Sequence, residues 1–161
     1  AEANLNGISL LDERQHVDHH TVVDHAVPNC QSNELYKGIF DEKSHGVFNG
    51  SVIVRQDAQK TNAFQQNDNV LLTDTATIDS KPQLEIYADD VKCSHGCTIG
   101  QLDKDALFYL KSRGIGDREA KATLLYAFKH DAMEIVRIEA LRKRLNKIIA
   151  KKLNVEIDFE L

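Results

Sequence analysis

The fold is decided by residues 82–97, which read PQLEIYADDVKCSHGC. The apolar burst at residues 84–87 is typical of a short strand, and the pair Asp89-Asp90 predicts a turn before the next strand. If the chain is extended again after this turn, alternate side chains share a face at about 7 Å spacing. The stretch therefore predicts strand, turn and strand, with Cys93, His95 and Cys97 on one face of the second strand.

Similar short apolar bursts continue through residues 8–101, separated by Asn, Asp, Gly, Ser and Gln. These residues favour turns, and no ten-residue stretch here has helical spacing, so the region is predicted to be all-β. A sandwich, a barrel and a solenoid all remain open. Strands of two to five residues, few prolines and frequent Asn favour a right-handed β-helix, although no strict repeat period is visible.

After residue 102 the pattern becomes helical. Asp103 is a suitable N-cap for a first helix that Gly114 would end, and Asp117 is a suitable N-cap for a second, with Leu124, Leu125 and Phe128 facing inward. A third helix is expected from about residue 131 to 153. Its apolar stripe would comprise Ile138, Leu141, Leu145, Ile148 and Ile149, with Lys143, Arg144, Lys147 and Lys151 largely opposite.

Met133 and Val136 fall on the basic side of this expected third helix. Either they pack on the two preceding helices, or they contribute to a partner-binding face together with Lys143 and Lys147.

Composition limits the classes of function. The net charge is −5, but residues 1–102 contain 7 Lys and Arg against 15 Asp and Glu, whereas residues 103–161 contain 13 against 10. An acidic body argues against nucleic acid binding along it. There is no run of 18 apolar residues and no secretory signal, so we expect no membrane span and a cytoplasmic protein. The chain opens Ala-Glu-Ala without an initiator Met, which suggests a fragment.

Cys93, His95 and Cys97 form the densest cluster of soft donors. Thiolate and imidazole suit zinc, copper(I) or an iron-sulfur cluster. Three donors on one strand do not easily surround a metal, so a closed site would need ligands from elsewhere, and ordinary structural residues are the alternative. The odd number of cysteines, with Cys30, favours free thiols in a reducing compartment.

Two other clusters have simpler interpretations. The histidines of residues 16–25 (His16, His19, His20 and His25) are expected to form hydrogen bonds across neighbouring rungs, on a strand that turns a corner. Asp89 and Asp90 would point to opposite faces of a strand and could not flank one glycosidic bond, so a turn is the better prediction. The sequence has no phosphate-binding loop and no nucleophile elbow.

The motif of residues 82–96, followed by LFYLKSRGI at residues 107–115, resembles the SufB/SufD family of iron-sulfur cluster assembly scaffolds. The resemblance continues upstream in DHHT (18–21), YKG (36–38), GVFNG (46–50) and AQKT (58–61), and covers about residues 14–130. The form Cys-Ser-His-Gly is more similar to SufD than to SufB. A C-terminal core fragment of a SufD-like protein is therefore expected.

The resemblance implies an all-β right-handed parallel β-helix followed by a small C-terminal α-helical domain, which we place at residues 1–102 and 103–161. It implies a non-catalytic scaffold that pairs through its β-helix with SufB or a second copy of itself, and binds the SufC ATPase through its helices. Cys93 and His95 match the residues implicated at the interface where an iron-sulfur cluster forms transiently. No cluster is expected to stay tightly bound to the isolated chain.

Cys97 stands where many relatives have Ala, so only its position on the strand makes it an additional candidate ligand. Two other classes of function remain open: a β-helix carbohydrate-active enzyme, which a carboxylate-lined groove would favour, and a structural oligomeric module without a ligand.

Overall fold

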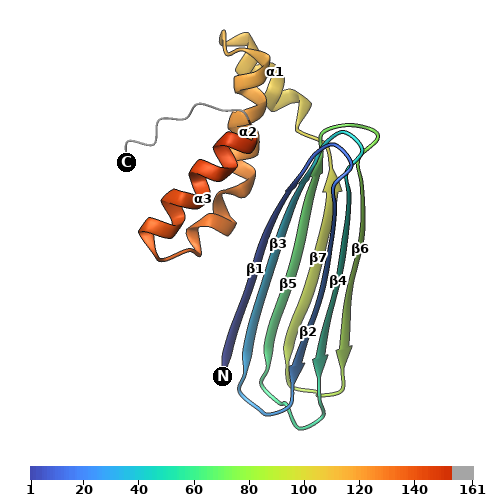
Figure 1. Cartoon of the computed structure of the whole chain (residues 1–161). Helices are drawn as coiled ribbons and strands as arrows, with labels where there is room; N and C mark the ends of the chain where they lie inside the picture. Colours follow the sequence, from blue (N-terminus) through green and yellow to red (C-terminus); the bar gives the residue numbers. More distant parts are fainter. Residues whose placement is uncertain (154–161) are drawn as a thin grey trace. The chain divides into compact units, whose positions relative to one another are not determined.

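A computed structural model describes residues 1–153 of the chain. The chain divides into two compact units, Ala1–Gly100 and a second that begins at Gln101. The predicted helical segment 103–161 therefore extends beyond the described residues by 154–161. The first unit is a parallel β-helix (Figure 1). Its strands are β1 (Glu2–Leu11), β2 (His16–His25), β3 (Gln31–Phe40), β4 (His45–Val54), β5 (Asn62–Leu71), β6 (Thr77–Ile86) and β7 (Lys92–Gly100).

Successive strands alternate between two sheets. One sheet has the order β1-β3-β5-β7 and the other the order β2-β4-β6, with every pairing parallel. The register aligns Glu2 with Gln31, Asn62 and Lys92, so one rung contains 29 to 31 residues in this sheet. In the other sheet His45 pairs with Thr77, 32 residues later. The period varies because the turns differ in length, which explains why no strict repeat is visible in the sequence.

The strands are longer than predicted. They contain nine or ten residues instead of two to five. The strand lengths predicted from the apolar bursts were too short, because polar residues occupy both faces of the strands. On β5, Gln65, Asn67 and Asn69 are buried and point into the β-helix. An apolar run therefore stops where the strand continues.

The interior is packed in two apolar clusters. Val52, Val54, Ala58, Ala63 and Ala88 form the larger one, which we call the core cluster, with Cys93 among the half-buried residues packed against it. The other contains Leu11, Phe40 and Ala76. The Phe40 ring occupies space left by two glycines, because a Cβ atom at Gly38 or Gly46 would lie 2.3 or 2.4 Å from its ring carbons. Glycine is thus required by packing at both positions.

The helical unit begins as predicted. Helix α1 (Lys104–Ser112) is capped by the Asp103 side chain, which accepts hydrogen bonds from the backbone amides of Asp105 and Ala106. Gly114 has a φ of +88°, as expected of a glycine that ends a helix. Helix α2 (Asp117–Glu134) has Gly116 as its N-cap, so Asp117 is its first residue and not its cap.

The predicted start of the third helix was wrong. Helix α3 (Glu139–Lys152) starts eight residues later than the predicted residue 131, because residues 131–134 continue α2. The break contains Ile135, Val136 and Ile138, and β-branched side chains disfavour the helical backbone. Met133 therefore belongs to α2 and is only 4% exposed, so it is part of the packing and not of an open face.

The predicted apolar stripe of α3 is also mostly uncovered. Ile149 is buried, whereas Ile138, Leu141 and Ile148 are exposed. On α2, Leu125 is buried and Leu124 and Phe128 are half-buried, as the predicted inward face requires. Across residues 1–153, none of the helices combines the length and apolar character needed to span a membrane.

Candidate functional site

The predicted donors lie on β7, which with β1 is one of the two edge strands of the four-stranded sheet within the described residues. Cys93, His95 and Cys97 are in register with Ala63, Gln65 and Asn67 of β5. Those three β5 residues are buried and point into the β-helix, so alternation places the three donors on the same inward face. The predicted shared face of Cys93, His95 and Cys97 is confirmed.

Cys93 is half-buried against the core cluster. Burial raises the pKa of its thiol, and a hydrogen bond with the backbone of Ala63 offsets part of this rise. The neutral thiol is thus favoured, and a metal would have to displace its proton, because the thiolate is the ligand. Cys93 therefore also contributes to packing.

Cys97 is exposed, but its thiol is held by a hydrogen-bond network. Its Sγ donates to Ser80 Oγ of β6 at 3.1 Å, across the interior of the β-helix. Ser80 Oγ in turn donates to Asn67 Oδ1 at 2.7 Å, and Asn69 Nδ2 donates to the same oxygen at 2.7 Å. This network fixes the direction of the Cys97 side chain more firmly than its exposure suggests.

His95 is exposed and forms no hydrogen bond or ion pair with the described residues. Within residues 1–153, no group of three His, Cys, Asp or Glu side chains is arranged to hold a metal ion. The three donors of β7 share a face without converging. Because they come from one extended strand, a closed metal site would need additional ligands from outside this strand.

The histidine-rich stretch forms one regular strand, β2, and does not turn a corner. His19 and His25 point inward: His19 Nε2 lies 2.9 Å from Ser9 Oγ, and His25 Nε2 lies 2.8 Å from Ser32 Oγ. The outward residues are His16, whose ring packs against His45 at 4.9 Å, and His20, which pairs with Asp18 at 2.9 Å. Hydrogen bonding was thus predicted correctly for His19 and His25, but their bonds reach β1 and β3 of the other sheet and not β4, the strand stacked on β2, so the predicted bonding across neighbouring rungs was wrong for these two. Aromatic packing was not foreseen.

Asp89 and Asp90 lie in the turn between β6 and β7, as predicted. The Asp90 backbone accepts a hydrogen bond from Lys60 N at 2.6 Å and donates one to Gln59 Oε1 at 2.9 Å. The Asp90 backbone therefore joins this turn to the preceding turn in the stack.

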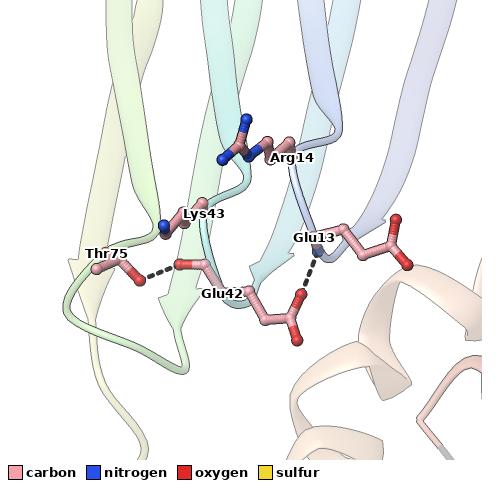
Figure 2. Close-up of a pocket in the computed structure, with 5 residues that line it drawn as sticks. All are labelled: Glu13, Arg14, Glu42, Lys43 and Thr75. Carbon is pink, nitrogen blue, oxygen red and sulfur yellow. Dashed lines mark hydrogen bonds between the residues drawn. The ribbon is translucent and has the colours of Figure 1, made fainter.

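A hollow at the other end of the strands is lined by residues of three stacked turns (Figure 2). The lining residues are Glu13, Arg14, Glu42, Lys43 and Thr75. Glu42 bridges both neighbouring turns: its Oε2 accepts from Glu13 N at 2.8 Å, and its carbonyl oxygen accepts from the Thr75 hydroxyl. Glu13 and Glu42 also have positive φ angles, of 51° and 54°. The hydrogen bonds around this hollow therefore join stacked turns to one another.

One set of buried polar residues was missed by sequence reasoning. Glu34 of β3 and Gln65 of β5 are 3% and 2% exposed, and Gln65 Nε2 donates to Glu34 Oε2 at 2.6 Å. Both are in the same column of the register as His95. Their spacing of 31 and 30 residues is the signal that could have revealed them once the rung length was known.

Comparison with known proteins places the chain in a family. The family model described as "SUF system FeS cluster assembly, SufBD core domain" matches residues 1–128. The chain is 40% identical over 149 residues to the iron-sulfur cluster assembly protein SufD of Escherichia coli (strain K12), covering 92% of this chain and 35% of that protein.

Two further relatives belong to the same family. A SufBD family protein of Synechocystis is 42% identical over 143 residues, covering 89% of this chain and 32% of the relative. A SufBD family protein of Mycobacterium leprae is 35% identical over 162 residues, covering 96% and 41%. The chain thus spans about a third of the length of the E. coli and Synechocystis relatives. It belongs to the SufBD core domain family of the SUF system and is SufD-like.

Proposed function

We propose that the chain is a non-catalytic scaffold part of the SUF machinery, on which an iron-sulfur cluster is assembled as cargo at a contact with a partner chain. The observation that carries the proposal is the common inward face of Cys93, His95 and Cys97 on the edge strand β7. An edge strand has unpaired backbone groups that can meet another chain, so its soft donors can be completed by the partner's ligands.

The three donors have different starting states. Cys93 is a neutral thiol packed on the core cluster, His95 is open to solvent, and Cys97 is directed by Ser80. Binding of iron would release the proton from Cys93, since metal affinity depends on deprotonated ligands. His95 can bind with a neutral ring nitrogen and needs no such release. All three cysteines are free, which fits a reducing compartment such as the cytoplasm.

The pairing partner in this proposal is SufB or a second copy of the chain, and it binds through the β-helix. The SufC ATPase binds the helical unit. Exposed apolar side chains on α1, on α3 and at the N-cap of α3 support such a docking role: Phe108 is 74% exposed, Ile138 66% and Ile148 55%. This set replaces the face around Met133 and Val136 that the sequence suggested, because Met133 is buried.

The test is reconstitution of the chain with SufB and SufC, followed by measurement of subunit stoichiometry, bound iron and transfer of clusters to an acceptor protein. Cys93→Ala and His95→Ala should each lower cluster assembly while leaving association unchanged. Cys30→Ala is the matched control, since Cys30 is also a free thiol but lies in the turn before β3. Normal assembly by the Cys93→Ala, His95→Ala double variant would refute the proposed role of these residues.

Self-association provides a separate test. Sedimentation of the chain alone should show a dimer at micromolar concentration if the edge strand pairs with a second copy. If only the 18.1 kDa monomer is found, pairing with a second copy is excluded and SufB remains as the proposed partner.

A further inference from the structure

The interior of the β-helix contains one column of residues that changes from apolar to polar along the stack. Leu5, Glu34, Gln65 and His95 occupy equivalent positions on β1, β3, β5 and β7. All four point inward, because they alternate with outward residues such as Asn33 and Phe64. The polar part of this column therefore runs from the buried Glu34 to the exposed His95.

The two buried members are bonded to each other but are not satisfied. Gln65 Nε2 donates to Glu34 Oε2 at 2.6 Å. Gln65 Oε1 and Glu34 Oε1 are buried and have no hydrogen-bond partner. A buried acceptor without a donor is costly, and native proteins satisfy the great majority of such atoms. The carbonyl oxygen of Gln65 therefore requires a donor.

The position of the Gln65 amide is restricted by its neighbours. Gly50 of β4 leaves the space that the amide fills, since a Cβ atom at Gly50 would lie 2.4 Å from Gln65 Nε2. With its nitrogen bonded to Glu34 on the β3 side, the amide has its carbonyl available to the β7 side, as in a ladder of stacked amides. The residue in register on that side is His95.

His95 has the complementary deficiency, because its ring has no polar partner among residues 1–153. A histidine that binds a metal through one ring nitrogen generally donates the N–H of the other to a fixed acceptor, and this bond sets the tautomer and the ring orientation. Gln65 is the buried acceptor on the neighbouring rung.

We propose that Gln65, held by Glu34, is the positioning residue of His95: when the exposed His95 ring turns toward its neighbour on β5, Gln65 Oε1 accepts the N–H of one ring nitrogen and directs the other ring nitrogen toward the partner interface. The inference rests on the proposed function for the role of His95 in cluster assembly. The bond between Gln65 and His95 can be tested without a cluster.

The experiment measures the tautomer of the His95 ring in the full chain by long-range proton–nitrogen NMR correlation, at about pH 8.5, where an ordinary imidazole is neutral. The variants are Gln65→Leu and Gln66→Leu. Gln66 is the matched control because it is the same residue type on the next position of β5 and faces outward, where its Nε2 donates to Asp68 Oδ1 at 2.6 Å. Peak assignment uses the His95→Asn variant.

One tautomer should predominate in the parent chain and in Gln66→Leu. In Gln65→Leu the tautomer ratio should change about threefold or more, the factor expected from one lost hydrogen bond. If Gln65→Leu does not fold, Gln65→Asn replaces it, since Asn occupies positions 67 and 69 of the same face but is too short to reach His95. A folded Gln65 variant with the parent's tautomer ratio overturns the proposal, whatever the outcome of the cluster-assembly assay.

Discussion

The β-helix and the helical unit differ most in how completely their own residues cover their apolar side chains. In the β-helix, Phe40, Phe48, Val52 and Val54 are at most 1% exposed. In the helical unit, buried residues are concentrated on α2, whereas α1 has none and α3 has one, Ile149. Each rung of a solenoid covers the next, so burial accumulates with every turn, whereas short helices cover only what they directly contact.

This contrast indicates where each unit obtains its stability. The β-helix has the dense interior of an independently packed fold. The helical unit leaves Phe108, Ile138 and Ile148 open, and such side chains contribute little until something covers them. Substitutions of the same chemical type should therefore have very different effects in the two units.

The largest effect is expected from removing one aromatic ring in each unit. Phe40→Ala should lower the free energy of unfolding by about 3–5 kcal/mol, because the ring is 1% exposed and a cavity would remain. Phe108→Ala should change it by less than about 0.5 kcal/mol in the isolated chain, since this ring is 74% exposed. Chemical denaturation monitored by circular dichroism measures both. Equal losses would contradict the difference between the units.

An intermediate effect is expected from adding one methyl group to the β-helix. Gly46→Ala places a Cβ atom 2.4 Å from the Phe40 ring and 2.6 Å from Ile78 Cδ1, so we expect a loss of about 1–3 kcal/mol through overpacking. Gly100→Ala is the control, because a Cβ atom there meets nothing within 4 Å. If both variants unfold at the same denaturant concentration, the interior is looser than the contacts of Gly46 require.

The sequence predicted the elements that depend on local chemistry. Asp103 as a helix cap, Gly114 at a positive φ, and the turn at Asp89 and Asp90 each follow from the conformational preferences of one or two residues. The common face of Cys93, His95 and Cys97 follows from the alternation of a strand. The family resemblance then supplied the β-helix, which the apolar pattern alone left among three architectures.

What could not be predicted depends on contacts between rungs. Strand lengths were underestimated because buried Asn67 and Asn69 bond to each other, which makes polar residues acceptable inside the β-helix. The polar column of Glu34, Gln65 and His95 requires a register that the variable turns conceal. Similarly, the break between α2 and α3 contains β-branched residues. Their individual effects on helix stability are too small to predict the position of the break reliably from one sequence.

A smaller effect, dependent on pH, should arise within the β-helix from His25. Burial lowers the pKa of His25, with Asp24 opposing the shift. The unfolded chain therefore takes up a proton near pH 6.5 that the folded chain resists, so the stability that neutral His25 provides should fall as the pH drops below about 6.5. Thermal unfolding at about pH 7.5 and 5.5 measures this change. His25→Gln should remove this contribution, so a folded His25→Gln variant with the pH dependence of the parent would contradict the prediction.

The smallest effect is expected from the ion pairs of Asp117 in the helical unit. Lys111 and Lys121 lie 2.7 and 2.9 Å from its carboxylate oxygens and lower its pKa to about 2. The folded pKa lies below that of the unfolded chain, so the pairs stabilise the unit above about pH 4, and this contribution is lost as the pH falls through about 2. All three side chains are about half exposed, and water and salt screen them. Asp117→Asn should therefore lower the unfolding temperature of the helices only slightly at neutral pH, and still less in high salt.

Glu119→Gln is the matched control, because it removes an acidic residue from the same first turn of α2 without breaking a lysine pair of Asp117. If the two variants are equally destabilised at low salt, the effect comes from the helix dipole and not from the link between α1 and α2.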